Sequence, residues 1–225
     1  MIQTVFLDID NTLLDFNECA KASSMKAFRD LNLTFHDEVF PVFIEENDKL
    51  WLKIEDGSLT REELHKIRWQ LIFDRLQIDA DGILMEKLFL HHIKESPVLM
   101  SGALDLLTYL SPKYTVCLAS NAPEQQQLKR LAHTPIPPLV DYIFLSEALG
   151  AAKPEKAFFD ACFARLLGAS PETSIIIGDS LTADILGGMA YGMKTCWFNP
   201  KHLPHPTEYN IDYVVHSLME IQKIL

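Results

Sequence analysis

The chain has 225 residues, of which 48% are hydrophobic and 23% are charged, the composition of an ordinary soluble globular protein. Its formal net charge of -11 argues against binding to nucleic acid polymers or to anionic membranes, because both of these partners are negatively charged themselves. The four cysteines lack CxxC or zinc-ligand spacing, and the N-terminus carries neither a basic region nor a long apolar stretch. We therefore expect buried, reduced thiols and a cytoplasmic protein without a signal peptide or transmembrane helix.

The first predicted element is a short strand over residues 5–7, and Asp8 and Asp10 follow it directly. If the strand geometry persists through Asp10, both carboxylates point to the same side, because side chains along a strand alternate. Two such carboxylates repel each other unless a divalent cation neutralises them, and their hard oxygens suit Mg²⁺. With a metal bound, one carboxylate is available as a nucleophile and the other as an acid or base. The alternative to a catalytic or metal-binding role is that these residues simply form a polar turn after the strand.

Residues 17–95 contain no convincing strand. The apolar spacing and the break signals predict four helices, over residues 20–31, 38–54, 60–76 and 81–94. The third helix opens with Thr60 and, three residues later, Glu63, the pattern of a capping box. Because a crossover between parallel strands needs only about a dozen residues, we interpret residues 17–95 as an inserted helical cap. Residues 1–16 and 96–225 then form the core domain.

From residue 100 onward, predicted helices and strands alternate. Strands are expected over residues 114–119, 142–145, 174–177, 195–198 and 213–215, and helices over residues 103–110, 125–131, 154–167 and 183–191. Pro154 fits the first turn of its helix. The isoleucines at 175–177 are typical of a strand buried on both faces. This alternation predicts an α/β fold with a parallel, doubly wound sheet.

Polar side chains gather near the ends of several predicted strands. Ser120 and Asn121 follow the second strand, Lys153 comes just before a helix, and Asp179 and Asp184 follow the run of isoleucines. Each has an ordinary structural explanation when taken alone, as a helix cap, a surface charge or a turn. Their common position at the loops of one parallel sheet, together with the two early aspartates, indicates a single functional site.

These clusters resemble the four motifs of the haloacid dehalogenase-like (HAD) hydrolase superfamily. The matching residues are Asp8, Asp10 and Thr12 for the first motif, Ser120 and Asn121 for the second, Lys153 and Pro154 for the third, and Gly178, Asp179 and Asp184 for the fourth. The resemblance spans essentially the whole chain. It implies a Rossmann-like core with an all-helical cap inserted after the first motif.

The resemblance also implies roles for the catalytic residues. Asp8 is expected to be the nucleophile that forms an aspartyl-phosphate. Asp10 is expected to protonate the leaving oxygen and then to activate water, Ser120 to donate a hydrogen bond to the phosphoryl group, and Lys153 to balance negative charge. Phosphoryl transfer depends mostly on positioning and electrostatic stabilisation, which these groups supply.

For the cofactor, the resemblance implies Mg²⁺. Its expected ligands are Asp8, the main-chain carbonyl of Asp10, and Asp179, with Asp184 in a direct or outer-shell position. The residues expected to contact substrate are Thr12, Asn121 and Trp51.

Asp10 distinguishes between branches of this family. Dehalogenase members resemble this chain but lack a second aspartate in the first motif and need no Mg²⁺, so Asp10 favours a phosphomonoesterase. The alternatives left open are a sugar-phosphate phosphatase or phosphomutase, a 2-haloacid dehalogenase, and a non-catalytic binding protein. Retention of all the expected catalytic residues argues against the last of these.

The predicted substrate is a small phosphorylated metabolite, in the first place a nucleoside 5′-monophosphate. The segments around Trp51, residues 57–60 and Arg68 are similar to the caps of bacterial pyrimidine-type 5′-nucleotidases, as are residues 184–188 and 195–199. Shared ancestry without a shared substrate is the alternative. We expect no nucleic acid polymer and no membrane as a partner, and a monomer or a small homo-oligomer.

Overall fold

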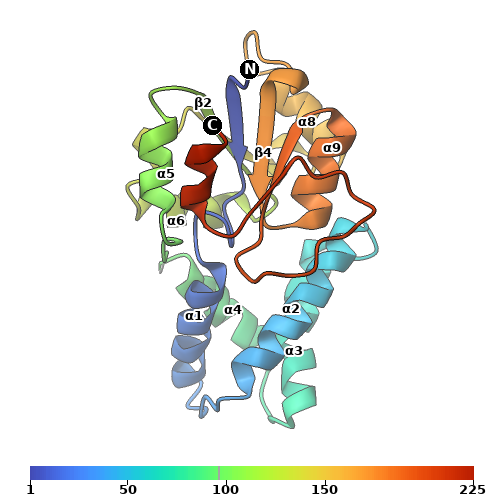
Figure 1. Cartoon of the computed structure of the whole chain (residues 1–225). Helices are drawn as coiled ribbons and strands as arrows, with labels where there is room; N and C mark the ends of the chain where they lie inside the picture. Colours follow the sequence, from blue (N-terminus) through green and yellow to red (C-terminus); the bar gives the residue numbers. More distant parts are fainter. Residues whose placement is uncertain (96) are drawn as a thin grey trace. The chain divides into compact units, whose positions relative to one another are not determined.

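The computed structural model describes residues 1–95 and 97–225, which divide into two compact units (Figure 1). The first unit consists of Met1–Asp15 and Val98–Leu225, and the second is Phe16–Pro97. In the described part of the chain, no helix combines the length and the apolar character needed to cross a membrane.

The first unit is built on a six-stranded sheet in the order β3-β2-β1-β4-β5-β6, and all of its strand pairs are parallel. The strands are β1 (Thr4–Leu7), β2 (Thr115–Ser120), β3 (Tyr142–Leu145), β4 (Ser174–Gly178), β5 (Lys194–Phe198) and β6 (Tyr213–Val215). The predicted α/β fold with a parallel sheet is therefore confirmed.

Helices cover both faces of this sheet. They are α5 (Ala103–Leu110), α6 (Glu124–Ala132), α7 (Ser146–Leu149), α8 (Lys156–Phe163) and α9 (Gly187–Tyr191), with short turns at Pro137–Leu139, Pro171–Thr173, Leu181–Leu186 and Leu218–Lys223. In Figure 1, α5 lies on one side of β1 and β4, and α8 and α9 lie on the other.

The run of isoleucines in β4 shows how the strands fill both layers. Ile175 and Ile177 belong to the hydrophobic cluster that includes α5, whereas Ile176 belongs to the cluster that includes α8. Because side chains alternate along a strand, a strand covered on both faces must be apolar at every position. All three isoleucines are fully buried, as the sequence predicted.

The strand order places a topological switch point between β1 and β4. From β1 the chain proceeds to β2 and β3 on one side, and then crosses to β4 on the other side of β1. In open α/β sheets, ligands bind outside the carboxyl ends of the strands at such a point. Asp8 directly follows β1 and Asp179 directly follows β4, so both lie at this position.

Two predicted helices of this unit differ from the observed ones. The helix expected over residues 154–167 is wrong at both ends, because α8 runs from Lys156 to Phe163. Glu155 has an extended backbone (φ -59°, ψ 135°), which delays the start, and the N–H of Arg165 bonds to the carbonyl of Cys162, a tighter pattern that ends the helix. The helix expected at residues 183–191 begins earlier, as a wider π-type turn over Leu181–Leu186, before α9.

The second unit is helical throughout its described secondary structure. It contains α1 (Phe16–Asp30), α2 (Val39–Glu55), α3 (Arg61–Leu76) and α4 (Gly82–Ile93). The capping box is confirmed, since Thr60 Oγ1 accepts from the N–H of Glu63 at 3.2 Å and the N–H of Thr60 donates to Glu63 Oε2 at 2.8 Å. An aromatic cluster that includes Trp69 forms its core.

A buried polar group lies inside this second unit. Arg68 is only 3% exposed and donates to Glu86 Oε1 at 2.7 Å and to Asn47 Oδ1 at 2.8 Å. His65 Nδ1 lies 2.7 Å from the same carboxylate oxygen of Glu86. Arg68 belongs to the segments that resemble nucleotidase caps, and in the structure it is paired within its own unit.

Candidate active site

The chain turns immediately after β1. The N–H of Asp8 still donates to the carbonyl of Ile177 at 2.9 Å, which extends the ladder with β4 by one residue. The condition under which Asp8 and Asp10 would point to the same side, strand geometry through Asp10, is not met, because β1 ends at Leu7. Just beyond, Asn11 has a positive φ of 59°. Asparagine tolerates this left-handed conformation better than most residues.

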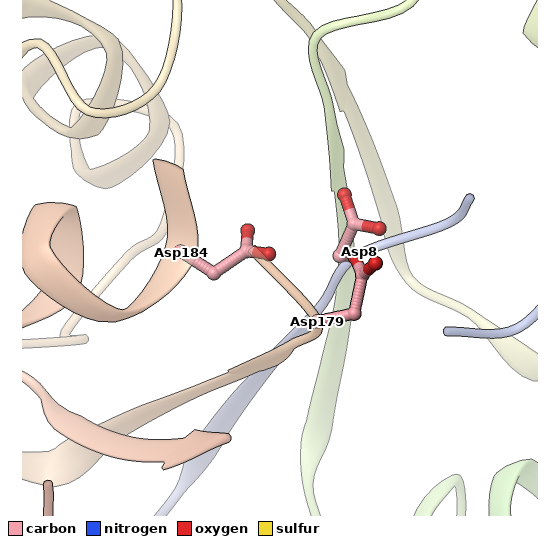
Figure 2. A group of neighbouring side chains, drawn as sticks. All are labelled: Asp8, Asp179 and Asp184. Atoms are coloured by element: carbon pink, nitrogen blue, oxygen red, sulfur yellow. The ribbon is translucent and has the colours of Figure 1, made fainter. Parts of the chain in front are cut away.

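Three carboxylates converge at the switch point. One oxygen each from Asp8, Asp179 and Asp184 lies within 4.8 Å of the other two, and Figure 2 shows the three side chains approaching one another. Asp184 comes from the π-type turn after β4 and packs against Gly178. A Cβ added at Gly178 would lie 2.0 Å from Asp184 Oδ2, so only glycine permits this approach. Trp197 Nε1 donates to the main-chain carbonyl of Asp179 at 3.0 Å and helps to hold this loop.

Lys153 is the cation of the cluster and is only 2% exposed. Its Nζ donates to Asp8 Oδ1 at 2.8 Å, to Asp184 Oδ1 at 2.6 Å and to the carbonyl of Ala119 at 2.7 Å. These three bonds use every hydrogen that an ammonium group carries. Lys153 thereby links the ends of β1 and β2 to the turn after β4.

Asn121 fixes the main chain of Lys153. Its Oδ1 accepts from the N–H of Lys153 at 2.9 Å, and its Nδ2 donates to the carbonyl of Lys153 at 2.8 Å. Sequence reasoning assigned Asn121 to substrate binding. In the structure, both ends of its amide are engaged by the lysine's main chain, so its side chain positions the lysine.

The electrostatic balance of the cluster is negative. Burial raises the pKa of Asp8 to about 7, against an ordinary value of 3.8, even though the charge of Lys153 acts in the opposite direction. Burial, followed by the charges of Asp8 and Asp184, also raises the pKa of Asp179 well above its ordinary value. Burial alone would lower the pKa of Lys153, but the carboxylates of Asp184 and Asp8 raise it. One lysine thus faces three carboxylates, and a set of hard oxygens with surplus negative charge fits a divalent cation such as Mg²⁺.

The carboxylate of Asp10 is not part of this three-carboxylate group. Its Oδ2 accepts from Gln127 Nε2 at 2.6 Å, and its Oδ1 forms an ion pair with Nη1 of Arg130. The metal role that the sequence analysis expected for Asp10 belongs to its main-chain carbonyl, which these side-chain contacts do not involve. Ser120 Oγ belongs to the same network, because it also accepts from Gln127 Nε2, at 2.9 Å.

Sequence reasoning missed Gln127 and Arg130. Both lie on α6, directly after the Ser120–Asn121 cluster, and both are fully buried. A signal was present in the sequence. The two residues share a helix face with the apolar Leu131, so polar side chains stood at positions where a core-facing helix is normally apolar.

The remaining predicted residues lie apart from these contacts. Thr12 is fully buried, and its Oγ1 has no hydrogen-bond partner among the described residues. Trp51 lies on α2, in the second unit, and is half-buried. The contacts described above thus join the predicted residues of the core other than Thr12, whereas Trp51 belongs to the other unit.

Comparison with known proteins agrees with this arrangement. A family model described as haloacid dehalogenase-like hydrolase matches residues 2–192. HAD-hydrolase YfnB of Bacillus subtilis is 34% identical over 99% of this chain and 95% of its own length. A crystal structure of YfnB bound to magnesium reveals interdomain movement. It superposes on this chain with a TM-score of 0.93, over 100% of this chain and 98% of that one. Pyrimidine 5′-nucleotidase PynA of Streptococcus pneumoniae is 29% identical over 96% of this chain and 92% of its own length. Pyrimidine 5′-nucleotidase YjjG of Escherichia coli is 29% identical over 98% of this chain and 96% of its own length.

Proposed function

This chain belongs to the haloacid dehalogenase-like hydrolases, and from that premise we propose that it is a Mg²⁺-dependent phosphomonoesterase that acts through an aspartyl-phosphate intermediate. The observation that carries the proposal is the Asp8 carboxylate, placed at the β1/β4 switch point in contact with a buried lysine and followed two residues later by Asp10. Asp10 favours phosphate ester hydrolysis over dehalogenation, because a phosphate ester needs a proton donor for its leaving oxygen.

The residues divide the reaction into two steps. Lys153 engages Asp8 Oδ1, which leaves Oδ2 to attack phosphorus as the bond to the ester oxygen breaks. Asp10 gives its proton to that oxygen, and the alcohol departs. Asp10 then takes a proton from water as the water oxygen attacks the phosphorus of the aspartyl-phosphate; the bond between phosphorus and Asp8 Oδ2 breaks, which restores the Asp8 carboxylate and releases inorganic phosphate. Ser120 donates a hydrogen bond to the phosphoryl oxygens, and Lys153 balances their charge.

Asp8, Asp179 and Asp184, with the main-chain carbonyl of Asp10, are the residues that we propose to hold Mg²⁺. Their oxygen donors and surplus negative charge fit this ion. When bound, the ion neutralises negative charge on the transferring phosphoryl group. The related YfnB binds magnesium in its crystal structure, which supports this assignment.

We propose that selectivity for the leaving group comes from the helical second unit, in which residues 17–95 form the cap. The core residues act on the phosphate, so the rest of the substrate must be recognised by other side chains. Two relatives of 29% identity are pyrimidine 5′-nucleotidases, which supports a nucleoside 5′-monophosphate as the substrate. We assign Trp51 to contact the base. Interdomain movement in YfnB supports a cap that opens and closes around the substrate.

Phosphate release from a panel of phosphorylated metabolites tests both parts of this proposal. Uridine 5′-monophosphate is expected to have a higher kcat/KM than small sugar phosphates, which offer no flat face to bury, and EDTA is expected to abolish all turnover until Mg²⁺ is restored. Trp51→Ala should raise KM for uridine 5′-monophosphate and leave KM for the small sugar phosphates unchanged. Leu52→Ala, at the neighbouring residue that is 56% exposed, is the matched control. Sugar phosphates outperforming every nucleotide would refute the substrate class alone, whereas turnover in metal-free buffer would refute the metal assignment.

Stabilisation by Mg²⁺ is expected to depend on pH. Because burial raises the pKa of Asp8 to about 7, its carboxyl group holds a proton at pH 5.5 that competes with the metal, and the raised pKa of Asp179 acts in the same direction. As pH rises from about 4 toward 7, the metal-free fold loses stability because the Asp8 carboxyl is ionised more readily in the unfolded chain; by pH 8 its proton has left, and bound Mg²⁺ offsets the repulsion. The increase in Tm on adding Mg²⁺ should therefore be larger at pH 8 than at pH 5.5, with a gain of about 2.7 kcal/mol at about 100 times Kd.

Differential scanning fluorimetry of two variants provides the control for this shift. Asp179→Ala should lose the Mg²⁺-dependent increase in Tm, whereas Asp160→Ala, at an exposed aspartate on α8, should keep it. Equal shifts at both pH values would contradict the proposed competition between protons and metal.

A further inference from the structure

Helix α6 presents two buried polar side chains, Gln127 and Arg130, to the catalytic groups of the core. We propose that they are positioning residues: they hold the Asp10 carboxylate in one orientation, and Gln127 also makes the Ser120 hydroxyl a hydrogen-bond donor toward the phosphoryl group. The inference rests on the phosphomonoesterase function proposed above and assigns to α6 a part in that reaction.

The amide of Gln127 fits in only one direction. Its Oε1 accepts from Arg130 Nη1 at 3.0 Å, and its Nε2 donates to Asp10 Oδ2 at 2.6 Å and to Ser120 Oγ at 2.9 Å. A guanidinium can only donate and a carboxylate can only accept, so a flipped amide would face a mismatched partner on both sides. The two hydrogens of Nε2 are therefore divided between Asp10 and Ser120.

This arrangement determines which way the hydroxyl of Ser120 points. A serine hydroxyl has two lone pairs and one hydrogen, and it can donate or accept. Here Gln127 Nε2 occupies one lone pair, and the N–H of Ala122, at 3.2 Å, occupies the other. The hydrogen is thus directed to an acceptor, and the oxygens of a phosphoryl group are acceptors.

Two side chains of α6 bind the carboxylate of Asp10. Arg130 binds Oδ1 and Gln127 binds Oδ2, which fixes the rotation of the carboxylate about its side-chain bond. Arg130 is fully buried, whereas the side chain of Asp10 remains 23% exposed. Each carboxylate oxygen keeps a second lone pair for a further partner, so the open side can face the leaving oxygen or the attacking water.

Burying a guanidinium carries a large desolvation penalty, whereas an apolar side chain of similar volume could pack at the same position with a smaller one. The presence of the guanidinium opposite Asp10 is explained if the pair serves the alignment of the carboxylate. A misplacement of about 1 Å in a reacting group can cost about 10²-fold in rate, so a fixed support has a large effect on turnover.

A series of substituted phenyl phosphates, assayed with Mg²⁺, tests the positioning role without depending on nucleotide recognition. In Gln127→Met, kcat/KM should fall by about 10–10²-fold for the poorest leaving groups and by less than about 3-fold for p-nitrophenyl phosphate, whose leaving oxygen needs little protonation. All substrates are measured on one preparation, so a loss of folded enzyme lowers every value equally and leaves their ratio unchanged. The inhibition constant of inorganic phosphate should also rise, because Ser120 loses its fixed orientation.

Three further variants complete the test. Gln125→Met, on the exposed side of the same helix, should behave as the parent protein. Arg130→Lys keeps the positive charge but changes the hydrogen-bond geometry, so it should show the same dependence on the leaving group. If Gln127→Met yields no folded protein, Arg130→Lys tests the positioning role in its place. In an Asp10→Ala background, Gln127→Met should add no further dependence on the leaving group, because the group that it positions is gone.

The outcomes separate this inference from the function on which it rests. A uniform loss across the series, or an added dependence on the leaving group that persists in the Asp10→Ala background, would overturn the positioning of Asp10. An unchanged inhibition constant of inorganic phosphate in Gln127→Met would overturn the orientation of Ser120, and both outcomes would leave the phosphatase intact. A parent protein that releases phosphate from no member of the series would overturn the proposed function itself.

Discussion

Asp8→Asn is expected to lower phosphate release by at least about 10⁴-fold while the protein stays folded, since removal of a catalytic nucleophile has effects of this size in other enzymes. An amide oxygen cannot form the acyl-phosphate, but it can still accept the hydrogen bond that Lys153 Nζ makes to Oδ1. The side chain is also nearly the same in shape, so the packing at the end of β1 is preserved.

The melting temperature of this variant provides an independent check. Burial raises the pKa of Asp8 to about 7, so the ionised carboxylate weakens the metal-free fold above that pH, and a neutral amide removes this penalty. In EDTA at pH 8, Asp8→Asn should therefore melt no lower than the parent protein. Asp105→Asn, at an exposed aspartate in the same unit, should retain full activity. Turnover close to that of the parent in Asp8→Asn would refute the assignment of the nucleophile.

Lys153→Met is expected to impair both stability and activity. The lysine donates all three of its ammonium hydrogens to buried acceptors, so its loss leaves the Asp8 and Asp184 carboxylates without their cation. Removing one partner of a buried ion pair costs about 3–5 kcal/mol. Phosphate release should fall by at least about 10²-fold, because charge stabilisation at the phosphoryl group is lost as well.

The stability loss in Lys153→Met should grow with pH. The charge of Lys153 lowers the pKa of Asp8, so in its absence the pKa of that carboxyl rises further above its ordinary value of 3.8. A group whose folded-state pKa is raised contributes an increasing penalty as pH rises from its unfolded value toward its folded one. Urea unfolding in EDTA should therefore show a larger deficit at pH 8 than at pH 5.

The matched control for this substitution is Lys156→Met. Lys156 lies three residues further along and pairs with Asp160, but its side chain is 78% exposed. Such surface ion pairs contribute about 0–1 kcal/mol, so this variant should unfold close to the parent protein at both pH values. Equal unfolding free energies for Lys153→Met and the parent at pH 8 would contradict the structural role of the buried lysine.

The secondary structure and the architecture of the core could be predicted from the sequence because their signals are local. The isoleucines of β4 predicted a strand covered on both faces, and Thr60 with Glu63 predicted the start of α3, since in each case the residues that matter are neighbours along the chain. The end of α8 could not be predicted in the same way, because its last turn tightens into shorter hydrogen bonds that leave no mark in the apolar pattern.

The candidate site was predicted as a set of residues, but their partners were decided only by the tertiary structure. Asp10 is 117 residues from Gln127 and 120 from Arg130, and Lys153 is 145 residues from Asp8. A sequence pattern shows which side chains carry chemistry and where strands end. It does not show that α6 packs with its polar side chains against Asp10, because a hydrogen bond between distant segments depends on how the strands and helices are packed, and the packing involves residues from the whole core unit.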